Sequence, residues 1–108
     1  MRVTVIYRVD PGALGPGSES IVEGFCRFAQ KEFDDLFKDC IDWEIMPRFD
    51  KSEKEIQYKI RNRDLSVQQA SLYLDALGKE QGSFESKLYK QLESSIAHYQ
   101  HLRSRMAS

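Results

Sequence analysis

The chain has 108 residues, of which 41% are hydrophobic and 31% charged, and its formal net charge is -1. This length suits one domain, and this composition excludes collagen-like, mucin-like and fully disordered chains. The near-balance of charge also argues against a protein that binds polyanions through bulk positive charge. No apolar run reaches the length of a membrane helix, and the first residues lack the pattern of a secretion signal, so we expect a cytoplasmic protein without membrane contact.

The first predicted element is a strand over residues 2–9, where apolar and polar side chains alternate. Val3, Val5 and Tyr7 would lie on its apolar face, and the opposite face is mostly polar. Proline and glycine residues then stop the strand and predict a flexible loop over about residues 10–18.

A helix is expected to begin near Ser20, whose spacing from Glu23 is that of a capping box. Apolar side chains recur along it every three or four residues and form one continuous face. We expect it to end near Lys38 or Asp39. Cys26 lies next to the apolar face, which predicts a buried and unreactive thiol.

Two more strands are predicted over residues 41–45 and 56–60, because isoleucine and aromatic residues alternate there with polar ones. The polar stretch between them is expected to connect them as a β-hairpin. Tyr58 would point into the core. Opposite charges would then face each other across the hairpin and fix its register, namely those of Asp42, Glu44, Lys59 and Arg61.

Two helices follow the predicted hairpin. Ser66 and Gln69 have capping-box spacing at the start of a short amphipathic helix, and Gly78 suits a left-handed cap at its end. A longer helix is expected to begin at Ser83, with a frayed tail over about residues 103–108. Its apolar stripe is longer than a three-stranded sheet needs, so the excess would pack on the short helix, on a partner or on a second copy.

These elements predict a single α+β domain over residues 1–108 with the order β-α-β-β-α-α. The three strands would form a sheet in the order 1-3-2, because the third strand would lie between the other two and run antiparallel to both. The first and last helices would pack on one face of this sheet, and the opposite face would be polar.

No motif in the sequence identifies a reaction, so we predict no catalytic residue, no cofactor and no metal site. The glycine loop lacks the Gly-Lys-Ser/Thr triplet of a phosphate cradle. His98 and His101 share a helix face but lack further ligands nearby. Cys26 and Cys40 follow no catalytic motif, and free thiols are favoured over a bridge between them.

The favoured hypothesis is a small, non-enzymatic interaction or regulatory protein that acts by contact with a protein partner. One candidate surface is an acidic patch at the end of the first helix, formed by Asp34, Asp35 and Asp39. The other is the C-terminal helix at Tyr99 and Leu102, which would hold a protein partner or a second copy of the chain.

The alternative is a nucleic-acid-binding module, which is less favoured because acidic residues dilute the basic ones. Basic and aromatic residues in the predicted hairpin and basic residues in the tail would contact phosphates and bases. Its candidate residues are Arg48, Lys51, Lys59, Arg61, Arg63, Arg103 and Arg105. Residues 1–46 carry a net charge of -4 and residues 47–108 a net charge of +3, so we expect a partner to dock where this asymmetry is not neutralised.

Overall fold

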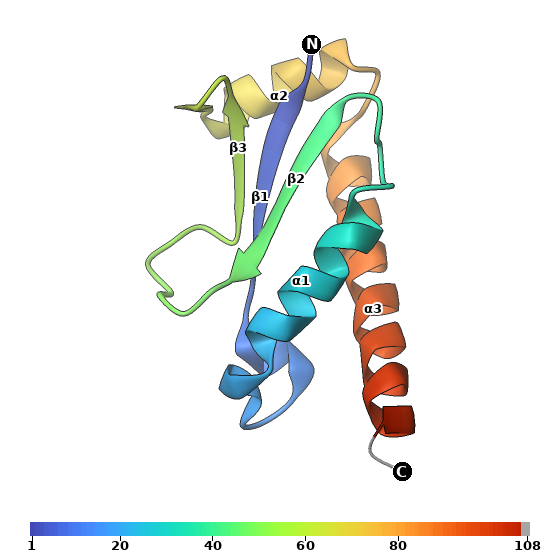
Figure 1. Ribbon diagram of the computed structural model, residues 1–108. Helices are drawn as coiled ribbons and strands as arrows, with labels where there is room; N and C mark the ends of the chain where they lie inside the picture. The colour runs from blue at the N-terminus through green and yellow to red at the C-terminus, as the bar shows by residue number, and fades with distance from the viewer. Residues whose placement is uncertain (107–108) are drawn as a thin grey trace.

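Three helices pack against a four-stranded mixed sheet in the computed structural model, which describes residues 1–106 (Figure 1). The strands are β1 (Val3–Val9), β2 (Ile41–Pro47), β3 (Ile56–Ile60) and β4 (Arg63–Asp64). The α-helices are α1 (Val22–Phe33), α2 (Val67–Ala76) and α3 (Gln81–Met106), and two 3-10 helices, η1 (Pro11–Leu14) and η2 (Ser18–Ser20), lie between β1 and α1. The predicted α+β class is confirmed, and the predicted three-stranded sheet gains a short fourth strand.

The order of the strands differs from the prediction. It is β2-β1-β3-β4, with β1 parallel to β2 and antiparallel to β3. The predicted order 1-3-2 and the hairpin between β2 and β3 are therefore wrong. The connection between β2 and β3 passes around the end of β1, where the Arg48 amide donates to the Val9 carbonyl at 2.8 Å and the Arg8 amide donates to the Glu55 carbonyl at 2.8 Å.

The charge pairs predicted across that hairpin are wrong for the same reason. Asp42 pairs with Arg2, at 2.8 Å between the guanidinium and the carboxylate, and does not face Lys59. Lys59 lies 3.9 Å from Asp64 of β4. The side chain of Glu44 lies on the exposed face of β2, next to Ile6 in the register with β1. Each of the two charge pairs therefore joins residues other than those expected.

β1 lies inside the sheet and is buried on both faces. Its valines and Tyr7 face the helices, and Tyr58 of β3 joins them in the core as predicted. On the opposite face, Ile6 is only 5% exposed and Arg8 only 9%. The Arg8 guanidinium donates to the Lys54 carbonyl at 2.8 Å and to Gln57 Oε1 at 3.0 Å. The first of these bonds holds the connection between β2 and β3 against the sheet.

α1 is shorter than predicted at both ends. The expected capping box of Ser20 and Glu23 does not form, because Ser20 belongs to η2 and Ile21 is the residue that precedes the helix, without a side-chain cap. The helix ends at Phe33, and tight turns over residues 34–40 lead into β2. Cys26 is buried on this helix, as predicted.

The starts and ends of α2 and α3 follow local hydrogen bonding. Both bonds of the Ser66–Gln69 capping box are present, and Gly78 has the left-handed conformation with φ at 75°. α3 begins two residues before Ser83, because the Glu80 carboxylate accepts a hydrogen bond from the Ser83 amide and caps an earlier first turn.

The first part of α3 packs on the sheet, and α3 also packs against α1 (Figure 1). Near its start, the Phe84 ring stacks on the Trp43 ring, with centroids 5.7 Å apart and planes 2° apart. Farther along, Ser95 is fully buried and donates to Glu32 Oε1 at 2.7 Å, while Glu32 Oε2 lies 2.7 Å from Nδ1 of His98. Beyond the sheet, the stripe packs on α1 at Tyr99, whose ring contacts Phe25 and Phe28. Met106 at its end is 84% exposed, and contact of this end with a partner or a second copy stays a prediction.

Candidate functional site

The residues of the predicted acidic patch lie in and around the turns between α1 and β2. Asp34 accepts a hydrogen bond from Gln30 Nε2 at 2.8 Å. Asp35 is exposed, and Asp39 is exposed but offers its backbone carbonyl to Arg2 at 2.9 Å. Asp34 therefore has a contact inside the chain, while the carboxylates of Asp35 and Asp39 face solvent. Their use by a partner remains a prediction.

The predicted docking residues of the last helix differ in their surroundings. The ring of Tyr99 packs against Phe25 and Phe28 of α1, with centroids 5.5 Å and 5.2 Å apart, and is half-buried there. Leu102 is also half-buried, one turn farther along α3. Tyr99 therefore contributes to the packing of α1 on α3, and its use by another molecule, like that of Leu102, stays a prediction.

The basic candidates for nucleic-acid contact fall into separate parts of the molecule. Arg48 and Lys51 lie in the connection between β2 and β3. The guanidinium of Arg48 donates to the backbone carbonyls of Glu53 at 3.0 Å and Lys51 at 3.1 Å. Lys51 also lies 3.8 Å from Asp10. This pair therefore helps to order its own loop.

The remaining basic candidates lie far from that loop. Lys59 belongs to β3, Arg61 to the turn after it and Arg63 to β4, at the end of the sheet where β1 begins. Arg103 and Arg105 lie in the last turn of α3, at the opposite end of the molecule from that turn (Figure 1). The structure does not bring the predicted set together as one nucleic-acid surface.

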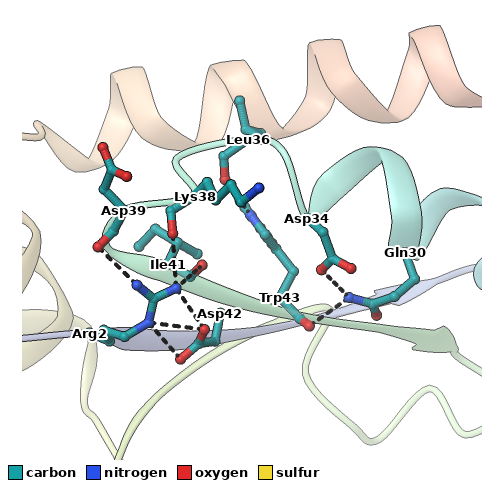
Figure 2. Close-up of polar contacts among 9 residues, drawn as sticks. All are labelled: Arg2, Gln30, Asp34, Leu36, Lys38, Asp39, Ile41, Asp42 and Trp43. Atoms are coloured by element: carbon teal, nitrogen blue, oxygen red, sulfur yellow. Dashed lines mark hydrogen bonds and ion pairs between the residues drawn. The ribbon is translucent and has the colours of Figure 1, made fainter.

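The outer edge of β2 is closed by the side chain of Gln30 (Figure 2). Its Nε2 donates to the Trp43 carbonyl at 2.8 Å, and its Oε1 accepts from the Ile45 amide at 2.8 Å. These are two of the backbone groups that a neighbouring strand would pair with at this edge. Pro47 at the end of β2 has no N–H, so the pairing of another strand with this edge is interrupted at three backbone positions.

Arg2 closes the other end of β2 (Figure 2). Its guanidinium donates to the Asp42 carboxylate, and to the carbonyls of Lys38 at 3.0 Å and Asp39 at 2.9 Å. The hydrogen bond from Arg2 lowers the pKa of Asp42 below its ordinary value. The start of β2 is thus tied to β1 by a side chain as well as by the backbone.

A groove of about 600 Å³ lies between α1 and the last residues of β2. Ile45, Met46 and Pro47 line one side, and Cys26 lies on the side of α1. Phe49, just after β2, lines the groove and is 58% exposed. Its lining atoms are mostly apolar, so the groove is an exposed apolar surface with one large aromatic side chain at its border.

Three charged residues of α1 border the groove: Glu23, Arg27 and Lys31. Neither Arg27 nor Lys31 makes a hydrogen bond or ion pair with another residue in the part of the chain that the structure describes. They are four residues apart and hence on one side of the helix. Burial raises the pKa of Cys26 to about 12, so its thiol is protonated and a weak nucleophile. The groove therefore suits binding more than thiol chemistry.

Sequence reasoning did not find this groove, because it depends on the parallel pairing of β1 with β2 and on the crossing of α1. Two apolar residues at positions expected to be polar nonetheless indicated an exposed apolar surface. Phe49 is an aromatic residue within an otherwise polar segment, and Met46 is an apolar residue at a position where the alternation of β2 predicts a polar one. Both prove to line the groove.

Residues 1–106 contain no group of three or more histidine, cysteine, aspartate or glutamate side chains placed to hold a metal ion. No helix within that range has the length and apolar character required to cross a bilayer. Cys26 and Cys40 are both unbridged. Comparison with protein-family models, curated proteins and solved structures finds no match, so the candidate site rests on its geometry alone.

Proposed function

We propose that this chain is a non-enzymatic interaction protein of the cytoplasm, which binds a segment of a protein partner in the groove between α1 and β2. The observation that carries the proposal is the combination of an exposed aromatic residue, an apolar groove and two cations that lack partners among the described residues. Interaction surfaces on proteins commonly combine an aromatic anchor with a polar rim.

The fitting partner is a short amphipathic helix whose apolar face enters the groove. Addition of a strand is disfavoured, because Gln30 already occupies the backbone groups of Trp43 and Ile45 at the edge of β2. Recognition must then come from side chains, and a helix presents apolar side chains at three- and four-residue spacing on one face.

The charge of the groove favours acidic residues on that partner helix. Arg27 and Lys31 would attract them, which would steer the encounter and fix the orientation of the helix. The exposed acids Asp35 and Asp39 lie beyond the other end of α1. A partner helix with acidic residues beside Arg27 and Lys31, and basic residues beside Asp35 and Asp39, would therefore be complementary to both charged regions of this chain.

The proposal has a direct test with a displayed library of amphipathic helical peptides. We expect enriched peptides to carry apolar residues on one face and acidic residues beside them. Their affinity, measured by fluorescence anisotropy, should fall at least about tenfold for Phe49→Ser, as is typical of an aromatic anchor. Reversal of both cations in Arg27→Glu/Lys31→Glu should weaken binding and remove most of its salt dependence.

Matched controls lie on α2 and α3. Leu72→Ser removes an exposed apolar side chain of similar exposure, and Lys90→Glu reverses an exposed charge. Both should leave peptide affinity unchanged. Enrichment of no peptide, or of peptides that bind Phe49→Ser as tightly as the original chain, would contradict the proposal.

Nucleic-acid binding has less support as the overall function, because the basic candidates are spread over three parts of the molecule. One of those parts nevertheless has features of a binding site for a smaller anion.

A further inference from the structure

The turn between β3 and β4 has an uncommon backbone conformation and is flanked by Arg63, the first residue of β4. Arg61 and Asn62 both have positive φ, at 50° and 66°. A two-residue hairpin turn of this type needs positive φ at both positions and favours Asn or Gly. Asn62 fits that preference, but Arg61 does not, since a long side chain is disfavoured there. The turn itself thus gives no reason for an arginine at this position.

A concavity of about 640 Å³ lies beside this turn, at the end of the sheet where β1 begins. Arg61 and Arg63 line it together with Arg2, and Ile60 and Tyr73 provide apolar and aromatic surface. Tyr73, from α2, is 36% exposed. This volume lies within the range of sites for small organic molecules, and its lining combines polar and apolar atoms.

The charges of this concavity do not cancel. The carboxylate that lines it, that of Asp42, is bound by the guanidinium of Arg2. The neighbouring carboxylate of Asp64 accepts from Gln57 at 2.6 Å and lies 3.9 Å from Lys59. The side chains of Arg61 and Arg63 form no hydrogen bond or ion pair with anything in residues 1–106. Two guanidinium groups are therefore left to receive an anion.

We propose that this concavity binds a nucleoside 5′-phosphate group, with the phosphate held by Arg61 and Arg63 and the base lying against Tyr73. Arginine matches phosphate oxygens with paired N–H donors, and a tyrosine ring offers a face or edge to a planar base. The same group occurs on a free mononucleotide and at the 5′ end of a single-stranded nucleic acid.

This site is independent of the proposed partner groove. The groove lies at the end of β2, near Pro47, which pairs with Val9 at the end of β1. The concavity lies at the other end of β1, beside Arg2 and Thr4. Loss of one activity by mutation should therefore leave the other intact.

The first experiment is calorimetric titration of the full chain with adenosine 5′-monophosphate at low salt. We expect saturable binding that weakens as salt is added, and at least about tenfold weaker binding of adenosine, which lacks the phosphate. Inorganic phosphate should also bind more weakly, because it lacks the base. Absence of binding at millimolar nucleotide, or equal binding of adenosine and the monophosphate, would overturn the proposal.

Substitutions of Arg61 and Arg63 test whether the nucleotide binds in this concavity. Arg61→Asn removes a guanidinium and keeps a residue that tolerates positive φ, so the turn should fold at least as well as before. It should weaken nucleotide binding at least about tenfold, and Arg63→Gln should act in the same direction. Lys90→Gln, on the exposed surface of α3, is the matched control. Unchanged affinity in Arg61→Asn, with the fold intact by circular dichroism, would refute this location.

Oligonucleotides distinguish the two sources of the ligand. If a strand end is the ligand, a single-stranded oligonucleotide with a 5′-phosphate should bind more tightly than both adenosine 5′-monophosphate and the same strand without the phosphate. If the free nucleotide is the ligand, the phosphorylated strand should bind no more tightly than the mononucleotide. Equal binding of strands with and without the 5′-phosphate, together with no mononucleotide binding, would contradict both versions.

Discussion

Gln30 takes the place of a strand at the edge of β2. Its amide group accepts from Ile45 and donates to Trp43, and the same Nε2 also lies 2.8 Å from Asp34. An exposed sheet edge is a template for pairing with another chain, and native proteins commonly block such edges. Here a single glutamine of the crossing helix supplies the block, so this one side chain affects both stability and solubility.

Substitution of Gln30 by leucine tests this role. Gln30→Leu should lower the free energy of unfolding by about 1–3 kcal/mol, because the Ile45 amide and the Trp43 carbonyl lose their partners. It should also promote self-association, which sedimentation at several concentrations would detect.

The matched control is Gln68→Leu on the exposed surface of α2. It should change the unfolding midpoint in urea little. If Gln30→Leu and Gln68→Leu behaved alike in both measurements, the role assigned to Gln30 would be wrong.

At the scale of single residues, the sequence predicted burial and capping correctly where these depend on residues a few positions apart. The inward position of Tyr58, the burial of Cys26 and the capping box of Ser66 and Gln69 all follow from spacing of a few residues, and all are confirmed. The partners of Gln30 lie thirteen and fifteen positions away. Their approach depends on how α1 crosses the sheet, which no local pattern reports.

At the scale of elements, the order of the strands could not be obtained from alternation alone. Alternation assigned the polar residues of β1 to a solvent-facing side, yet Ile6 and Arg8 are buried there. Ile6 on that side was a sign of an inner strand. The eight-residue connection between β2 and β3 was another sign, since hairpin loops are commonly shorter. Both observations favour a strand with neighbours on both sides.

The contact of α1 with α3 includes a close approach at Gly24. A Cβ added to Gly24 would lie 2.9 Å from the Tyr99 hydroxyl oxygen. The ring of Tyr99 packs against Phe25 and Phe28, so a shift of its hydroxyl would disturb these contacts. The glycine therefore allows the two helices to approach at this point.

Two substitutions test this close approach. Alanine is favoured over glycine inside a helix by roughly 1 kcal/mol. Gly24→Ala alone should not increase the free energy of unfolding by that amount, because the added methyl group would clash with the Tyr99 hydroxyl oxygen. In the background Tyr99→Phe, which removes the hydroxyl, Gly24→Ala should stabilise the chain by about 1 kcal/mol.

Urea unfolding of the original chain, both single variants and the double variant gives the coupling energy directly. An equal effect of Gly24→Ala in both backgrounds would show that the hydroxyl does not restrict position 24. The two substitutions are small, so all four chains are expected to fold.

At the scale of the whole molecule, the charge asymmetry of the sequence is only partly neutralised by the fold. Arg8 of the acidic half lies 3.3 Å from Glu53 of the basic half, and Asp10 lies 3.8 Å from Lys51. The expected neutralisation across a hairpin of β2 and β3 does not occur, since those strands are not neighbours. Within residues 1–106, the cations that the fold leaves without partners include Arg27, a border residue of the groove.

The whole core should lose stability in alkali. Burial raises the pKa of Cys26 and of Tyr89 to about 12, and it raises the pKa values of Tyr7 and Tyr58 further. The ordinary pKa values are 9.0 for cysteine and 10.0 for tyrosine. Between these values and the raised ones, the folded state keeps protons that the unfolded state releases. The free energy of unfolding must then fall as pH rises from about 9 toward 12.

Urea unfolding at pH 8, 9, 10 and 10.5 measures this effect, with the midpoint expected to fall at each step above pH 9. Cys26→Ala should remove most of the fall between pH 9 and 10. It should leave the fall above pH 10, because the tyrosines remain. A midpoint that stays constant up to pH 10.5 would contradict the burial of Cys26, Tyr7 and Tyr58.

The position of β1 in the sheet also has a consequence for folding during synthesis. β1 precedes both of its neighbours in the chain, and its partners β2 and β3 end at Pro47 and Ile60. Its two edges can be satisfied only after the ribosome has delivered both of those strands. Until then the apolar run of Val3–Val9 is exposed to other nascent chains and to chaperones. Pairing of both edges of β1 therefore requires the emergence of β3, and the time needed to translate residues 48–60 adds to the time during which one edge of β1 is unpaired.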